Sequence, residues 1–139
     1  MVILDTNVVS ETMQPEPSAG VMAWWSRQAE GGEAYVTSIT VAEVLYGIEL
    51  LPAGRRRAAL LAGVEKMFSG VFAGHILSFD EGAARMFAPV AAQRRGQGRP
   101  ISEFDAQIAA IALAHGATLA TRNVSDFEGC GVKLVNPWR

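Results

Sequence analysis

Five short apolar runs, separated by longer segments with helical spacing of apolar residues, constrain the fold of this chain more than any other feature. Short continuous apolar runs are typical of strands that are buried on both faces. Strands that alternate with helices form a parallel sheet covered by those helices. The pattern therefore predicts an α/β domain with a central, mainly parallel sheet of about five strands. The predicted strands are Val2 to Leu4, Tyr35 to Thr37, Ile76 to Phe79, Thr118 to Ala120 and Val132 to Val135.

The segments between these runs have the apolar periodicity and the stop signals of helices. Pro52 and Gly54 end one of them, Pro89 strains another, and the stretch from Gly96 to Pro100 is expected to be a loop. With 139 residues, no repeat and no linker, the chain is expected to form a single domain over residues 1–139. The predicted helices are an early one around Trp24 and Trp25, one from Val41 to Leu51, two over Arg55 to Phe68 and Glu81 to Arg95, and one from Ser102 to near Gly116.

Composition and charge narrow the class of protein. Half of the residues are hydrophobic, and the sequence begins without the basic leader and long apolar stretch of a signal peptide. Cys130 is the only cysteine, which excludes an intrachain disulfide and a cysteine-based zinc site. We therefore expect a soluble cytoplasmic protein that does not associate with a membrane. The formal charge of −2 excludes a broad basic surface, so any contact with nucleic acid must be local.

Polar residues follow three of the predicted strands directly, and they point to a site at one edge of the sheet. Asp5 follows the first strand, Asp80 the third and Asn123 the fourth. Ligands of parallel sheets bind in the crevice beyond the carboxyl ends of the strands. Asp and Asn are also ordinary helix caps, so the structural and the functional interpretation of Asp5 both stay open.

Two further acids lie at the beginnings of predicted helices. Thr40 and Glu43 match a capping box, in which the glutamate returns to the N-cap amide, and this favours a structural role for Glu43. Ser102 and Asp105 also form a cap-like pattern. Asp105 borders an apolar stripe that includes Phe104, so its side chain is expected to point toward the sheet edge.

Taken together, Asp5, Glu43 and Asp105 suggest a metal site. A hard divalent cation prefers oxygen ligands, and several carboxylates at one sheet edge would supply them. Without a cation such a cluster would repel itself. With Mg²⁺, it could activate a water and neutralise the charge of a phosphate group.

Four segments resemble the ordered motifs of PIN domains, and they are closest to the VapC and FitB-like toxins of toxin-antitoxin pairs. The resemblance extends over nearly the whole chain, including the ending Asn136-Pro137-Trp138. The motifs are specific in combination and weak singly. The segments are Leu4-Asp5-Thr6-Asn7, Thr40-Val41-Ala42-Glu43-Val44, Phe104-Asp105-Ala106-Gln107-Ile108-Ala109, and Ala120-Thr121-Arg122-Asn123 with Asp126-Phe127.

The resemblance implies a Rossmann-like, three-layer α/β/α domain that hydrolyses RNA phosphodiesters with Mg²⁺ or Mn²⁺. Asp5, Glu43 and Asp105 match the family's acidic metal-site positions, and Thr6, Asn7 and Thr121 match polar positions around that site. The family often has a fourth acid where this chain has Asn123, so the number of metal ions stays open. Asp126 is a candidate to replace that acid, with capping of a turn as the alternative.

The resemblance also implies partners. They are a cognate antitoxin of the VapB or FitA kind, a second copy of the chain in a homodimer, an RNA substrate, and promoter DNA reached only through the antitoxin. We expect a basic or apolar tail of the antitoxin to cover the acidic site and the helices around Trp24 and Trp25, one of which is expected to stay exposed.

Basic residues are concentrated in three places. Arg122 adjoins the candidate site and could touch the scissile phosphate or pair with a site acid. The triplet from Arg55 to Arg57, and Arg94 with Arg95 and Arg99, could bind RNA phosphates, although a solvated helix face is the favoured interpretation of the triplet. His75 and His115 have no partner at a catalytic or metal-binding spacing, which favours structural roles.

Two other classes of protein remain as alternatives. A phosphatase with Asp5 as its nucleophile would usually carry a second aspartate two residues later, where this chain has Asn7. A non-catalytic α/β binding module would use the acids as caps and solvated surface. Such a module should gain no stability when Mg²⁺ or Mn²⁺ is added.

Overall fold

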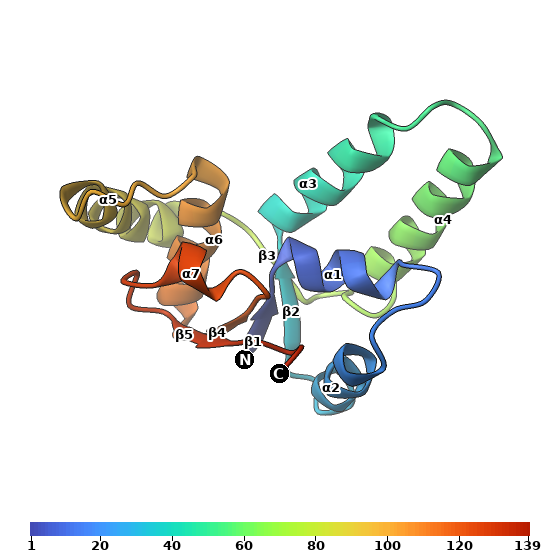
Figure 1. The fold of residues 1–139 in the computed structure, drawn as a ribbon, viewed down its shortest axis with the longest axis horizontal. Coiled ribbons are helices and arrows are strands. Elements are labelled where there is room, and N and C mark those ends of the chain that lie inside the picture. Colours follow the sequence, from blue (N-terminus) through green and yellow to red (C-terminus); the bar gives the residue numbers. More distant parts are fainter.

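Five parallel strands form the central sheet, in the order β3-β2-β1-β4-β5 (Figure 1). The computed structural model describes residues 1–139. The first strand of the sequence lies in the middle of the sheet, between β2 and β4. The elements are β1 (Val2–Leu4), α1 (Thr6–Thr12), α2 (Ala19–Glu30), β2 (Ala34–Thr37), α3 (Ser38–Glu49), α4 (Arg55–Ser69), β3 (Ile76–Leu77), α5 (Glu81–Gly96), α6 (Glu103–His115), β4 (Thr118–Ala120), α7 (Val124–Phe127) and β5 (Lys133–Val135).

Helices cover both faces of the sheet, as the predicted three-layer arrangement requires. Helices α1 to α4 lie on one side, and α5, α6 and α7 lie on the other (Figure 1). Successive side chains of a strand point to opposite faces. Accordingly, Leu4 of β1 belongs to the hydrophobic cluster under the first group of helices, whereas the adjacent Ile3 belongs to the cluster under the second. Both side chains are fully buried.

All five predicted strands are present, and two of them are shorter than expected. Strand β3 ends at Leu77, two residues early, and β5 begins at Lys133. The helix predicted after Ser102 is confirmed, because the Ser102 hydroxyl caps its first turn and Gly116 ends it in the left-handed conformation, with φ of 61°. Helix α5 continues through Pro89 to Gly96.

Other local features differ from the sequence predictions. Helices α1 and α7 were not expected. Helix α3 begins at Ser38 rather than at Val41, because the side chain of Thr37 caps it by accepting a hydrogen bond from the Thr40 amide at 3.1 Å. Thr37 therefore ends a strand and begins a helix at once, and the predicted capping box of Thr40 and Glu43 is wrong.

Trp24, Trp25 and Phe104 differ from expectation, whereas His75 agrees with it. Trp24 and Trp25 are both partly buried against the core, so neither stays exposed as predicted. Phe104 is 50% exposed and does not join the buried stripe of α6. His75 has the expected structural role, since its Nδ1 lies 2.9 Å from the Ala34 carbonyl oxygen and its ring stacks on Tyr35. None of the helices has the length and apolar character needed to span a bilayer.

Candidate active site

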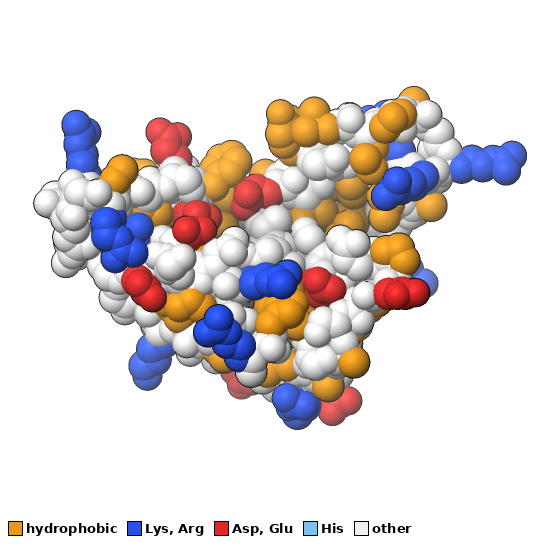
Figure 2. Space-filling view, in the orientation of Figure 1, with side chains coloured by type: hydrophobic (Ala, Val, Ile, Leu, Met, Phe, Trp, Pro, Cys, Tyr) orange, Lys and Arg blue, Asp and Glu red, His pale blue; other side chains and the backbone are white.

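The three predicted acids line one hollow of about 370 Å³ at the carboxyl end of the sheet, which we call the acidic pocket. No hydrophobic residue lines it, and neither does any arginine, lysine or histidine. Acidic side chains are visible at the surface between α3 and α6 (Figure 2). The lining residues are Asp5, Thr6, Asn7, Ser10, Glu43, Asp105 and Asn123.

Asp5 is the buried centre of this pocket, with only 5% of its surface exposed. It follows β1 and caps α1, since its Oδ1 accepts a hydrogen bond from the Thr6 amide at 2.9 Å. Its Oδ2 accepts hydrogen bonds from the Thr121 hydroxyl at 2.8 Å and from the Asn7 side-chain amide at 3.1 Å. The capping role is therefore confirmed, and the same contacts hold the carboxylate in one orientation inside the acidic pocket.

The environment of the pocket resists the ionisation of Asp5 and Asp105. Burial raises the pKa of Asp5 to about 6, the hydrogen bonds from Thr121 and Thr6 offset part of that effect, and the charges of Asp105 and Glu43 add to it. Burial also raises the pKa of Asp105, with a smaller contribution from the charge of Asp126. Carboxylates that repel one another without a basic neighbour are stabilised by a bound cation.

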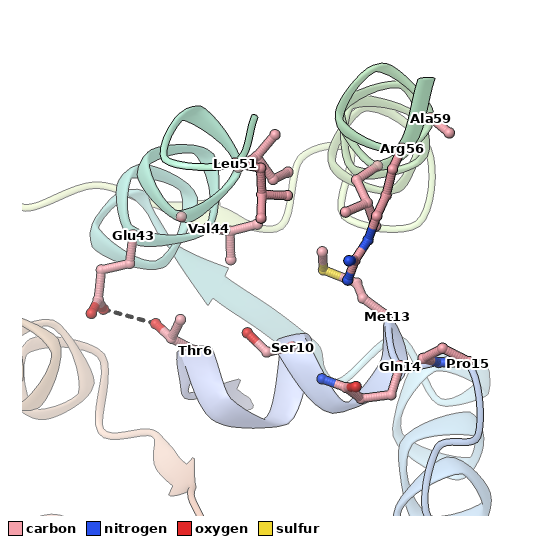
Figure 3. Close-up of a pocket in the computed structure, with 13 residues that line it drawn as sticks. Thr6, Ser10, Met13, Gln14, Pro15, Glu43, Val44, Leu51, Arg56 and Ala59 are labelled. Atoms are coloured by element: carbon pink, nitrogen blue, oxygen red, sulfur yellow. Dashed lines mark hydrogen bonds between the residues drawn. The ribbon is translucent and has the colours of Figure 1, made fainter. Parts of the chain in front are cut away.

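Glu43 reaches the pocket from α3 on the opposite side. Its Oε1 accepts a hydrogen bond from the Thr6 hydroxyl at 2.8 Å (Figure 3). The side chain thus bridges toward α1 and does not return to the start of its own helix. The Thr6 hydroxyl also lies 3.0 Å from that of Thr40, a fully buried residue that the sequence predictions did not place near the site. Ser10 was missed as well, since only the turn of α1 brings it to the pocket.

A hydrogen-bond network connects the end of β4 to the end of β1. The hydroxyl of Thr121, fully buried, accepts a hydrogen bond from the Asn123 amide at 3.0 Å and lies 3.2 Å from the Asn7 side-chain nitrogen. The Oδ1 of Asn7 accepts a hydrogen bond from the Arg122 amide at 3.1 Å. Thr6, Asn7, Thr121 and Asn123 are therefore placed around Asp5, as the sequence indicated.

Arg122 adjoins the site through its backbone, but its side chain turns away. The guanidinium carbon lies 5.0 Å from the ring centre of Trp138, and Arg122 takes part in none of the ion pairs of the chain. The alternative in which Arg122 pairs with a site acid is therefore not what the structure shows. Instead, a cation–π contact attaches the C-terminal residues to the rim of the site.

Asp105 and Asp126 lie on a second, smaller cavity of about 260 Å³ beside the acidic pocket. Asp105 is half-buried in the first turn of α6, as its wheel position indicated. Asp126 lies in α7, is exposed and does not line the acidic pocket. The chain therefore brings Asp126 close to Asp105 but not to Asp5, and its side chain does not cap the turn.

The donor set of the acidic pocket fits a divalent cation, although the side chains do not yet form a closed site. The pocket offers carboxylate, hydroxyl and amide oxygens and no competing positive charge, which is the set that Mg²⁺ or Mn²⁺ prefers. Asp5, Glu43 and Asp105 do not converge into a three-ligand cluster. Rotation of the half-buried Glu43 and Asp105 side chains is the simplest way to close it.

The other predicted phosphate-binding arginines have mixed roles. Arg94 is buried, with 4% exposure, and is unavailable to RNA, which corrects the prediction for that residue. Arg99 donates a hydrogen bond to the Ser125 carbonyl at 3.1 Å and pairs with Glu128 at 3.7 Å. Arg57 pairs with Glu49 near the surface. Arg56 of the triplet lines a cavity.

That cavity is a groove of about 510 Å³ between α1, α3 and α4, which we call the α3–α4 groove (Figure 3). Thr6, Ser10 and Glu43 line both the groove and the acidic pocket, so the two are continuous. Apolar side chains line much of the groove, and Arg56 lies on its α4 side, away from Glu43. The hydrophobic lining residues include Met13, Pro15, Val44, Leu51 and Leu60.

Comparison with known proteins identifies the family. Residues 2–128 match the family model described as the PIN domain. The chain is 41% identical over 138 residues to the VapC ribonuclease Y4jK of Sinorhizobium fredii, covering 99% of this chain and 98% of that protein. It is 38% identical to toxin FitB of Neisseria gonorrhoeae, covering 99% of each. A solved structure of FitAB bound to a DNA fragment superimposes with a TM-score of 0.92 at 38% identity, covering 100% of this chain and 96% of that one. The chain therefore belongs to the PIN-domain family.

Proposed function

We propose that this protein is an endoribonuclease that depends on Mg²⁺ or Mn²⁺ and hydrolyses RNA phosphodiester bonds, and that it acts in the cytoplasm as the toxin of a toxin-antitoxin pair that inhibits translation. The observation that carries the proposal is the buried carboxylate of Asp5, which faces two further acids with no basic side chain in the pocket. The names of its relatives, a VapC ribonuclease and a FitB toxin, support the same activity.

Asp5, Asp105 and Glu43 would hold the metal, and they would act as the catalytic acids. When bound, a divalent ion supplies a Lewis acid for the phosphate and a more acidic water. Other residues of the chain orient these metal-binding side chains. Thr121, Asn7 and the Thr6 amide hold the Asp5 carboxylate, and the Thr6 hydroxyl orients Glu43. The three hydrogen bonds to Asp5 leave one acceptor position on Oδ1, which is enough to bind a cation. Asn7 stands where a phosphatase would usually carry a second aspartate, so the nuclease is favoured over the phosphatase.

The number of metal ions follows from Asn123. Its side chain is a neutral oxygen donor where a carboxylate would add a full charge, so we expect one ion to bind firmly and a second only weakly or together with substrate. Asp126 lies beside Asp105 and is the remaining candidate ligand. If it binds metal, Asp126→Asn raises the metal concentration needed for cleavage, whereas Asn123→Asp lowers it. Unchanged metal dependence in Asp126→Asn would assign this residue to structure.

The α3–α4 groove is where we place the antitoxin, in preference to the half-buried Trp24 and Trp25 of α2. An amphipathic helix fits an apolar groove of this kind, and its basic end would reach the acids of the adjoining pocket. The solved structure of FitAB with DNA is consistent with promoter DNA reached through the antitoxin. A homodimer is part of the proposal, and exposed apolar side chains suitable for such an interface include Tyr46, Leu50 and Phe104.

The test uses purified protein and total RNA with Mg²⁺, with Mn²⁺ and with a chelator, beside Asp5→Asn purified in parallel. We expect cleavage only by the wild-type protein and only with metal, and sequencing of the cleaved ends after brief induction identifies the RNA. Thermal unfolding separates the alternatives, since a binding module gains no stability from either ion. Cleavage that persists in the chelator, or equally in Asp5→Asn, contradicts the proposal.

A further inference from the structure

Arg94 is a buried cation with no acidic partner in direct contact. It lies on α5 with 4% of its surface exposed, and it forms none of the ion pairs of the chain. Its Nε donates a hydrogen bond to the Arg99 carbonyl at 2.8 Å, and its Nη1 donates one to the Asp126 carbonyl at 2.7 Å. A buried charge paired only with neutral groups is costly for a fold. The presence of this buried charge therefore indicates that Arg94 contributes something other than stability.

The two carbonyl groups belong to segments that carry candidate site residues. The Arg99 carbonyl lies in the loop that leads to Ser102, which caps α6 by accepting a hydrogen bond from the Asp105 amide. The Asp126 carbonyl lies in α7, the short helix that follows Asn123. One planar guanidinium therefore joins α5 to both segments, and the hydrogen bond from Arg99 to the Ser125 carbonyl reinforces the junction.

Arg94 is also close enough to act on the site itself. Arg94, Asp105 and Asp126 line the same 260 Å³ cavity. An arginine that served only to stabilise α5 would have no reason to lie at this boundary between the acids and the core.

We propose that Arg94 is a positioning residue of the metal site, which fixes the loop before α6 and α7 relative to each other and thereby fixes the place of Asp105 opposite Asp5. The inference rests on the proposed function, because it assumes that Asp105 is a ligand. Outer partners that orient metal ligands typically contribute tenfold to a hundredfold to affinity. A lysine keeps the charge but cannot span two carbonyl groups with a rigid fork.

The experiment measures Mn²⁺ affinity by calorimetry, at a temperature where circular dichroism shows each variant folded. We expect Arg94→Met and Arg94→Lys each to bind Mn²⁺ at least about tenfold more weakly than wild type. The direction of the change in Mn²⁺ affinity is informative, because removal of a positive charge beside carboxylates would by itself strengthen cation binding. A loss of affinity in Arg94→Met therefore reports the displacement of ligands.

Two control variants distinguish a displacement of the metal ligands from a general loss of stability. Arg95→Met removes an exposed cation from the same helix and should leave Mn²⁺ affinity unchanged. Val90→Ala removes a buried side chain of α5 and should lower the melting temperature without changing affinity. Wild-type or stronger Mn²⁺ binding by Arg94→Met overturns the inference alone, and if that variant does not fold, Arg94→Lys decides by the same measurement. A wild-type protein that neither binds Mn²⁺ nor cleaves RNA overturns both this inference and the proposed function.

Discussion

The two helical layers of this protein are built differently around the same sheet. In the α5–α6 layer, α6 buries every residue from Ile108 to Ala112, and its alanines allow the close approach of its neighbours. In the α3–α4 layer, α3 buries only three residues, and Tyr46 and Leu50 stay exposed at 65% and 67%. Helices α3 and α4 lean away from the sheet and leave the groove between them (Figure 1). The α5–α6 layer is packed densely along α6 and exposes large apolar side chains only at Met86 and Phe104, whereas the α3–α4 layer has an apolar groove typical of a surface that binds a partner.

The acidic pocket lies where these layers meet, and it draws its acids from both. Glu43 belongs to the open layer, Asp105 to the closed one, and Asp5 to the strand between them. A partner that fills the groove therefore lies next to Glu43 without displacing the closed layer.

Loss of either aspartate of the acidic pocket should nearly abolish RNA cleavage while the fold survives. Asp5→Asn and Asp105→Asn each remove a charge with little change in volume, and we expect RNA cleavage to fall roughly a thousandfold. Glu43→Gln should also inactivate, without harm to α3, because Glu43 does not cap that helix. Glu103→Gln, an exposed neighbour outside the acidic pocket, is the matched control. Wild-type rates in either aspartate variant would remove the pocket from the mechanism.

Truncation should cost more stability in the closed layer than in the open one. Ile108 is fully buried in α6, so Ile108→Ala should lower the free energy of unfolding by about 3 kcal/mol. Leu60 lines the groove and is only partly buried, and Leu60→Ala should cost about 1 kcal/mol. Urea unfolding of both variants measures the difference. Equal losses would mean that the two layers are equally packed and that the comparison is wrong.

A charge placed in the α3–α4 groove should weaken the binding of the antitoxin and leave RNA cleavage unchanged. Ala59 is exposed and lines the groove, so Ala59→Glu should reduce antitoxin affinity about tenfold or more, a change of roughly 1.4 kcal/mol. The adjacent Ala58 is exposed but does not line the groove, so Ala58→Glu should bind normally. Titration of the antitoxin against each variant gives the affinities, and RNA cleavage by the free proteins shows whether the site is undisturbed. Equal binding by both would place the partner elsewhere.

Acid should weaken metal binding through Asp5, the residue between the layers. Its pKa is raised from 3.8 to about 6, so a proton occupies the carboxyl group below that pH and must leave before a cation binds. Mn²⁺ affinity should be constant above about pH 6 and fall about tenfold for each unit below it. In the metal-free protein, Asp5 loses its proton at a lower pH in the unfolded chain than in the folded one. The contribution of Asp5 to stability therefore falls as the pH rises from 3.8 to about 6. Affinity that is independent of pH would exclude Asp5 as a ligand.

The strands and the position of Asp5 at the end of β1 could be predicted from the sequence because both depend on local pattern. Strands buried on both faces are continuous apolar runs, and residues that follow parallel strands share one sheet edge, so Asp5, Asn123 and Thr121 could be placed together. Ser102 and Gly116 carry their own capping signals. These features need no knowledge of distant contacts.

What the sequence did not predict depends on residues far apart in the chain. The buried Arg94 donates hydrogen bonds to the carbonyl groups of Arg99 and Asp126. No local sequence pattern predicts these contacts. The role of Glu43 depends on Thr6, 37 positions away. The α3–α4 groove is set by the angle between two helices, which a helical wheel does not contain.

The central position of β1 in the sheet determines when the acidic pocket can form during synthesis on the ribosome. Asp5 is synthesised well before the Thr121 hydroxyl that orients it, which comes 116 positions later in the chain. The strand that carries Asp5 pairs with β2 and β4, and it lacks one neighbour until β4 has been made. A nascent chain therefore carries Asp5 before it has the geometry that orients this carboxylate. The acidic pocket can form only after β4 and Thr121 have been made.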